Sequence, residues 1–117
     1  MEKLYDSEYR LMQVLWDSGP VNSTHLVALC QQQLGWNKST TYTVLRKLKG
    51  KGAVLHQDTV VTPVLTRAQA VRAEGEELEK LAGGLSPFLT AFLSGRKLTQ
   101  KDAESLKALI DRNMEEE

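Results

Sequence analysis

Apolar side chains in the first fifty residues recur at helical spacing, in three stretches that turn residues separate. In the first stretch, which begins near residue 6, Leu11, Val14 and Leu15 share one face. Gly19 and Pro20 then end the helix, because glycine favours a helix end and proline has no N–H to donate to the preceding turn. The pattern predicts a first helix of about three turns.

The second stretch starts after Asn22, a residue type that caps helices by accepting a backbone N–H. Leu26, Leu29 and Cys30 form its apolar stripe, and Gly35 is placed to end the helix. Only one cysteine is present, which excludes an intrachain disulfide and suits a reducing cytoplasm. We interpret Cys30 as a small core residue, without assigning it a redox role.

A third helix of about twelve residues follows the connection over residues 36–39, with Val44, Leu45 and Leu48 directed inward and Gly50 and Gly52 at its end. Three short helices separated by tight turns are typical of a helix-turn-helix core. The two tryptophans, Trp16 and Trp36, are interpreted as packing residues of this core.

From residue 53 the pattern changes to β-branched residues, which predicts a hairpin of residues 53–56 paired with residues 60–64. Asp58 and Thr59 supply its turn, and Pro63 is expected to limit the second strand to a sheet edge. Thr66 and Gln69 then fit a capping box that opens a long polar helix, running to about Ala82.

The remaining residues predict two helices with apolar faces. Gly83-Gly84 interrupts the chain, Ser86-Pro87 is expected to cap the next helix, and Thr99 to cap the last one. Such a small region buries two apolar stripes most readily by dimerising. The predicted dimerisation residues are Leu85, Phe88, Leu89, Phe92 and Leu93 in the first stripe and Leu106, Leu109 and Ile110 in the second.

The sequence therefore predicts a mainly α protein with a small β-hairpin. Residues 1–72 form a winged helix-turn-helix domain, and residues 73–117 form a helical dimerisation region. No apolar run reaches the length of a membrane span, and the polar N-terminal residues lack the apolar stretch of a signal peptide, so we expect a soluble, cytoplasmic protein.

Charge separates the two regions. The whole chain has a net charge of zero, which argues against a histone-like binder of polyanions. Residues 1–72 nevertheless carry nine basic and five acidic side chains, whereas residues 73–117 carry six and ten. Between Ser18 and Gln57 there is no Asp or Glu at all. Such asymmetry is typical of nucleic-acid binding by the basic part.

The third helix is the one that a helix-turn-helix protein places in the major groove. Its outward positions carry groups that hydrogen-bond to bases or neutralise phosphates. Arg46 is a candidate for guanine or phosphate, and the lysines at its C-terminal end are candidate phosphate anchors. The predicted DNA-binding residues are Lys38, Ser39, Thr40, Tyr42, Thr43, Arg46, Lys47, Lys49 and Lys51.

Other chemistry lacks a motif. His25 and Cys30 lie about 140° apart around one helix and cannot chelate one metal without further ligands, so we expect no metal or other cofactor. The glutamates over residues 74–79 are interpreted as a solvated face. No nucleophile elbow, phosphate-binding glycine loop or HExxH motif is present, and we expect no enzymatic activity.

Several short motifs follow one another over nearly the whole chain. They are Ser7-Glu8-Tyr9, Val14-Leu15-Trp16, Gly19-Pro20-Val21, Gly35-Trp36-Asn37-Lys38-Ser39-Thr40, Leu45-Arg46-Lys47-Leu48, Lys51-Gly52 and the tail Leu98-Thr99-Gln100-Lys101-Asp102 with Leu106 and Leu109. In this order they resemble the BlaI/MecI/CopY family of bacterial repressors. The resemblance implies a homodimeric winged-helix repressor that binds a palindromic operator.

The chain departs from this family at three places. It lacks the C-terminal cysteine cluster of the copper-responsive members. Family members that a membrane sensor protease pathway inactivates are cut between Asn and Phe, and the nearest match is Ala91-Phe92, a candidate cleavage site. The wing, with Gln57, Asp58 and Thr59, has no basic residue. The alternative from another class is a winged-helix module that binds an acidic protein partner instead of DNA.

Overall fold

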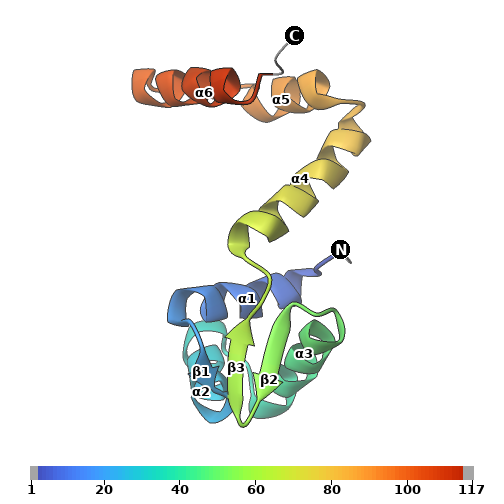
Figure 1. Ribbon diagram of the computed structural model, residues 1–117, viewed down its shortest axis with the longest axis vertical. Coiled ribbons are helices and arrows are strands. Elements are labelled where there is room, and N and C mark those ends of the chain that lie inside the picture. Colours follow the sequence, from blue (N-terminus) through green and yellow to red (C-terminus); the bar gives the residue numbers. More distant parts are fainter. Residues whose placement is uncertain (1–2, 115–117) are drawn as a thin grey trace. The chain divides into compact units, whose positions relative to one another are not determined.

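The computed structural model describes residues 3–114 and confirms a mainly helical fold with a small antiparallel sheet (Figure 1). Two compact units divide between Leu78 and Glu79, inside the fourth helix, which also contains the predicted boundary at residues 72 and 73. The elements in chain order are α1 (Asp6–Ser18), β1 (Val21–Asn22), α2 (Ser23–Leu34), α3 (Lys38–Gly50), β2 (Val54–Gln57), β3 (Val60–Pro63), α4 (Arg67–Ala82), α5 (Leu85–Leu93) and α6 (Gln100–Arg112).

The ends of the first helices are where local chemistry predicts them. Gly19, with a φ of 74°, follows the last residue of α1. The side chain of Asn22 accepts the N–H of Thr24 at 3.0 Å and caps α2, and Gly35 ends that helix in the left-handed conformation. These caps confirm the first two predicted helices.

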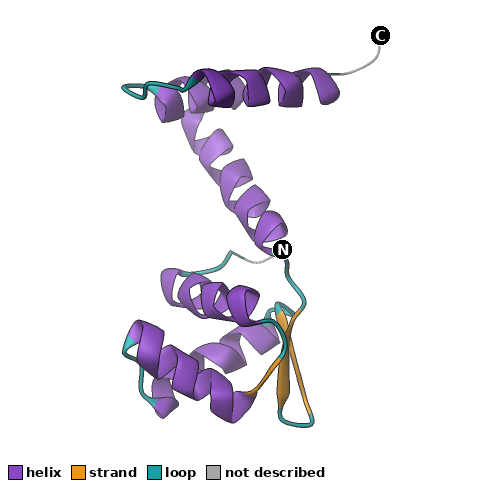
Figure 2. Ribbon diagram, turned by 90° about the vertical axis from the view of Figure 1, so that its left-hand side faces the viewer, coloured by secondary structure: helices purple, strands orange, loops and turns teal. Residues whose placement is uncertain are grey.

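The sheet corrects one prediction. Its strand order is β1-β3-β2, so β3, which contains Pro63, is the central strand and not an edge (Figure 1). Figure 2 shows the strands in orange, turned by 90° from that view. The two-residue strand β1, too short for an alternating pattern to reveal, pairs with Val60 and Val61 only. Pro63 lies beyond that pairing, opposite Val54 on β2, so its missing N–H interrupts no bond to β1.

The hairpin also starts one residue later than predicted. Ala53 lies outside β2 because its N–H donates to the carbonyl of Leu48 at the end of α3. Its own carbonyl accepts the N–H groups of Val64 and Leu65, which places Val64 outside β3. Ala53 therefore joins the third helix to the base of the hairpin.

The hairpin turn is held against the start of α2. Asp58 and Thr59 have φ values of 50° and 68°, the conformation of a tight turn that glycine and asparagine adopt most easily. The Thr59 carbonyl accepts the N–H of Ser23 at 2.7 Å, and its hydroxyl oxygen accepts from the Asn22 amide at 3.0 Å. These two bonds compensate the unusual backbone of a β-branched residue.

The core of the first unit is apolar and continuous. Cys30 lies in it fully buried, as predicted, and burial raises the pKa of its thiol, while a hydrogen bond from Thr41 partly lowers it. Trp16 and Trp36 pack against the core, which confirms their packing role. Its buried apolar residues are Leu4, Leu11, Met12, Val14, Leu15, Val21, Leu26, Cys30, Val44, Leu45, Leu48, Ala53, Val54, Val61, Leu65 and Ala70.

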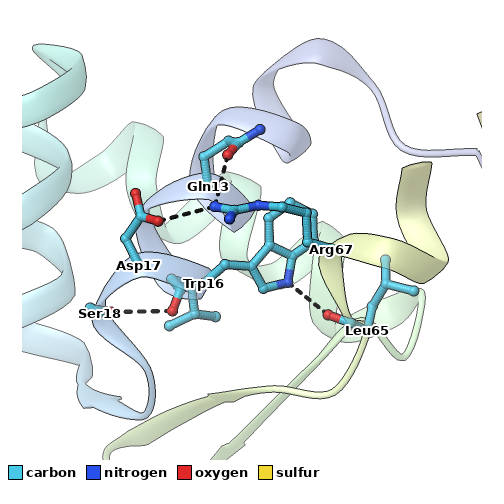
Figure 3. A network of polar contacts seen from close by, with 7 residues as sticks. Gln13, Trp16, Asp17, Ser18, Leu65 and Arg67 are labelled. Carbon is cyan, nitrogen blue, oxygen red and sulfur yellow. Dashed lines mark hydrogen bonds and ion pairs between the residues drawn. The ribbon is translucent and has the colours of Figure 1, made fainter. Parts of the chain in front are cut away.

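The first turn of α4 is bound to α1. Thr66 and Gln69 form the predicted capping box, each accepting the backbone N–H of the other. The indole N–H of Trp16 donates to the Leu65 carbonyl at 2.8 Å, and the Arg67 guanidinium donates to the Asp17 carboxylate at 3.0 Å (Figure 3). The first turn of α4 is therefore fixed to the winged-helix unit.

The second unit corrects another prediction. Helix α5 begins at Leu85, with Gly84 as its N-cap at a φ of 138° and no side-chain cap bond, so Ser86 is not the cap. Pro87 is the third helical residue, where the missing N–H still costs no intrahelical bond. Thr99 does cap α6, since its hydroxyl accepts the N–H of Asp102 at 3.0 Å.

Neither α5 nor α6 buries a single described residue. Across residues 3–114, every helix is too short or too polar to cross a bilayer.

Candidate DNA interface

Helix α3 is positioned by one cap and one buried face. The side chain of Asn37 accepts the N–H of Thr40 at 2.8 Å and sets where the helix begins. Val44, Leu45 and Leu48 are buried, as the apolar pattern predicts, and Thr41 is buried with them. The cap at Asn37 was not predicted, although an Asn just before a periodic apolar stretch is a recognised helix-start signal.

The outward face of α3 is polar along its whole length. Ser39, Thr43 and Arg46 are exposed and spaced four and three residues apart, so they form one stripe opposite the buried residues. Tyr42, half-buried, and Lys47, exposed, lie on either side of this stripe. The other exposed positions, nearer the margins of the face, are Lys38, Thr40 and Lys49.

The hydroxyl of Thr43 is already partly used. It donates its hydrogen to the carbonyl of Ser39 at 2.9 Å, a bond within the helix. Its oxygen can still accept a hydrogen bond, and its methyl group can meet an apolar atom such as a thymine methyl. Thr43 therefore presents an acceptor and a methyl group, but no free hydroxyl donor.

The positive charge of this face is not compensated by the protein. Among residues 3–114, no Asp or Glu forms an ion pair with Lys38, Arg46, Lys47 or Lys49. The ammonium of Lys38 lies 6.0 Å from the ring centroid of Tyr42. A helix face with four unpaired cations attracts phosphate along its length.

Lys51 differs from these four cations. Its Nζ donates to the Oε1 of Glu8 at 2.6 Å and to the carbonyl of Lys3 at 2.6 Å, and its side chain is largely buried. Glu8 lies 43 residues earlier in the chain, so no local pattern reveals this pairing. Lys51 was predicted together with the exposed basic residues of α3, but it differs from them in being largely buried and paired with Glu8.

The wing adds no positive charge. Gln57, Asp58 and Thr59 are exposed at its tip, and His56 is half-buried on β2. In the described part of the chain, no three His, Cys, Asp or Glu side chains gather as metal ligands would. The basic face of α3 is therefore the chemically distinctive surface of this unit.

The second unit brings most of its predicted residues together in a groove between α5 and α6. Phe88 and Phe92 have ring centroids 6.1 Å apart. Leu85 lies beside a separate shallow apolar hollow on α5. Leu98, which the family resemblance includes in the tail, was not among the predicted dimerisation residues, because it lies in the loop between α5 and α6. The apolar residues that line the groove are Leu89, Phe92, Leu93, Leu98, Leu106, Leu109 and Ile110.

Two comparisons with known proteins bear on this arrangement. An uncharacterised 16.5 kDa protein in the ptsI 3′ region of Latilactobacillus sakei is 39% identical over 46 residues. The match covers 39% of this chain and 32% of that protein, so the chain accounts for about a third of its relative's length. The family model of the penicillinase repressors matches residues 4–112.

The family match spans both the winged-helix unit and the helices that follow it. Its members are DNA-binding transcriptional repressors, which agrees with the unpaired basic face of α3. The chain therefore belongs to the penicillinase repressor family.

Proposed function

We propose that two copies of this chain form a dimer that holds two α3 helices against a palindromic operator and represses transcription by covering a promoter. In this arrangement the two helices enter the major groove about 34 Å apart, or a multiple of that distance. The observation that carries the proposal is the exposed face of α3. Polar groups and unpaired cations lie along this face, between the N-cap Asn37 and the C-cap Lys51.

On that face we assign two kinds of contact. Ser39, Thr43 and Arg46 occupy the central stripe, which faces base edges when the helix lies in the groove, with Tyr42 beside the stripe and Thr40 nearer the margin of the face. The lysines, with Lys47 beside the stripe and Lys38 and Lys49 nearer the margins, neutralise phosphates. With several such contacts, affinity falls steeply with salt, by a logarithmic slope of about −0.9 for each phosphate neutralised.

The second copy is the partner that the exposed groove of α5 and α6 fits best. Phe92, Leu109 and Ile110 are about half or more exposed in one copy, which is unusual for large apolar side chains on neighbouring helices. An identical face on a second chain covers them with the same apolar chemistry, and two-fold symmetry then matches a palindromic site.

Relief of repression by proteolysis is a further part of the proposal. The Ala91-Phe92 peptide lies in α5, a helix of nine residues with no buried side chain. Local unwinding of such a helix costs little in a copy that is free of its partner, so a protease can reach the peptide bond in an extended form when the dimer has dissociated. Incubation with the cognate activated sensor protease tests this step, and an intact chain afterwards would rule it out.

The DNA assignment is tested by gel shift with the upstream region of the protein's own gene. We expect a shift that weakens with salt and that is lost when Arg46→Ala and Lys47→Ala are combined. The matched control combines Lys101→Ala and Lys107→Ala on α6, which removes the same charge from the second unit. No salt-sensitive shift, or equal loss in both variants, would instead favour the acidic protein partner.

A further inference from the structure

Lys51 is the basic residue of the 38–51 cluster that the protein itself neutralises. We infer that Lys51 is a positioning residue: its ion pair with Glu8 sets the C-terminal end of α3 on α1, and its ammonium does not contact DNA. This inference rests on the proposed binding of DNA by α3, and it removes Lys51 from the phosphate contacts that the sequence analysis predicted.

The ammonium group contacts three groups inside the protein. Its hydrogens are directed to the Oε1 of Glu8 at 2.6 Å and to the carbonyl of Lys3 at 2.6 Å. The group also lies 4.6 Å from the ring centroid of Tyr5, within cation–π range. Oε1 of Glu8 additionally accepts the N–H of Tyr5 at 2.7 Å. The pair thus joins the segment before α1, the first turn of α1 and the end of α3.

Burial keeps this pair together when DNA approaches. The side chain of Glu8 is 1% exposed and that of Lys51 is 12% exposed. If Lys51 turned outward to a phosphate, it would leave a buried carboxylate without its cation, which is costly in a protein interior. The four exposed basic residues of α3 form no ion pair with a buried carboxylate, so they are free to contact phosphates.

The pair acts on α3 because of where Lys51 lies in the chain. It is the C-cap residue of the helix, and its backbone N–H donates to the carbonyl of Lys47. The inward face of α3 is mostly aliphatic and packs by shape, and the ion pair adds a directional contact at the C-terminal end of the helix. Within residues 3–114, the Glu8–Lys51 pair is the only ion pair that links α3 or its cap to another element.

Small rotations of α3 matter for reading bases. Side-chain ends lie about 6 Å from a helix axis, so a turn of about 20° moves them by about 2 Å. Hydrogen bonds to base edges tolerate less than that, whereas a flexible lysine follows a phosphate over such a distance. Loss of the pair should therefore reduce binding to a specific site more than binding to random DNA.

The experiment compares four variants on two probes. The probes are the duplex that the wild-type protein selects from a random-sequence pool and a random-sequence duplex. The variants are Lys51→Met, Glu8→Gln, both together, and Lys49→Met, which removes an exposed lysine two positions away as a matched control. Affinity is measured over a salt series, and circular dichroism establishes that each variant is folded at the assay temperature.

For Lys51→Met we expect about a tenfold or larger loss of affinity for the selected duplex, a smaller loss for the random duplex, and an unchanged salt slope. Glu8→Gln, at a buried position that cannot touch DNA, should show the same pattern, and the double variant should be no worse than either single one. Lys49→Met should weaken both probes equally and reduce the slope by about 0.9.

Three results would overturn the assignment while leaving DNA binding intact. They are a reduced slope in Lys51→Met, unchanged specificity in both single variants, and tighter binding by Glu8→Gln, which releases Lys51 toward phosphate. If Lys51→Met does not fold, Glu8→Gln decides the question by its effect on specificity and on affinity. A wild-type protein that selects no duplex from the pool would overturn the proposed function, and this assignment with it.

Discussion

The two units of the chain differ in what they bury. The unit that ends at Leu78 encloses a continuous core of aliphatic side chains around Leu11, Leu15 and Leu48. The unit that begins at Glu79 contains comparably apolar helices, yet α5 and α6 bury no residue. The first unit has the means to fold as a single copy, whereas the second exposes the kind of surface that a partner covers.

The two regions also differ in their charge. The exposed cations of α3 have no carboxylate partner among the described residues, while the second region of the chain has an excess of acidic side chains. A net charge of zero thus combines a surface suited to phosphate with a region that phosphate repels. Each of the following changes tests this division between a self-sufficient unit and a dependent one.

The largest expected effect comes from removing the second unit. A chain that ends at Leu78 should keep its helical circular dichroism, since all the buried core residues lie before that point. It should sediment as a monomer and bind the operator about 10²- to 10⁴-fold more weakly, because the two half-sites are no longer linked. A truncated chain that still dimerises would contradict the division.

The next largest effect should come from shortening a buried side chain in the core of the first unit. Leu11→Ala removes a fully buried side chain and should lower the free energy of unfolding by about 2–5 kcal/mol. Ile110→Ala, at a position that is 59% exposed in one copy, should leave the unfolding of the first unit unchanged. Urea unfolding of both variants, followed by tryptophan fluorescence, gives the comparison, since Trp16 and Trp36 both lie in the first unit. Equal losses would mean that the core extends beyond Leu78.

A charge in the groove should affect only association. Leu109→Asp places a carboxylate among the apolar residues of the groove and should weaken dimerisation about 100-fold, because the charge would be buried without a partner. Lys107→Asp, on the exposed surface of the same helix, is the control. Sedimentation over a range of concentrations measures both. If the two variants dimerise equally, another face forms the contact.

The smallest effect concerns pH. Burial raises the pKa of the Cys30 thiol in the folded protein, so the unfolded chain loses this proton first as pH rises. Stability from the neutral thiol is complete below the unfolded pKa of about 8.5 and declines as pH rises above it. Thermal unfolding at rising pH should show this decline, and Cys30→Ala should lessen it. An identical pH dependence in both proteins would assign the decline elsewhere.

Tyr9 contributes in the same direction at higher pH. Burial, and to a smaller extent the charge of Glu74, raise the pKa of its phenol, whose hydroxyl donates to the carbonyl of Ala70 at 2.9 Å. The effects of the two groups on stability can be told apart because cysteine ionises at lower pH than tyrosine. The Cys30→Ala comparison is therefore made below about pH 10. Both groups lie in the first unit, which agrees with its role as the self-sufficient part.

Features that depend on neighbouring residues were predictable. Asn22, Thr66 and Thr99 cap helices as expected, because an N-cap bond joins residues only two or three positions apart. The prediction of Ser86 as the cap was wrong because Gly84, with its freedom of φ, lets α5 begin two residues earlier, at Leu85. Local chemistry therefore places a helix within a residue or two, but a glycine can move the end.

Features that depend on distant residues were not predictable. The strand order required β1, whose two residues carry no period of their own. Lys51 differs from the other basic residues because it pairs with Glu8, which comes close only when the end of α3 packs on the start of α1. A list of basic residues in one helix gives no information about which of them the protein already neutralises.

By itself the sequence determined the helices, the hairpin turn, the basic stretch without acids and the apolar stripes near the C-terminus, because each depends on side chains within a turn or two of one another. Only the tertiary structure decided which strand is central, which cation is internal and which apolar residues remain exposed. Those outcomes depend on contacts between residues far apart in the chain, and burial and pairing exist only after the chain has folded.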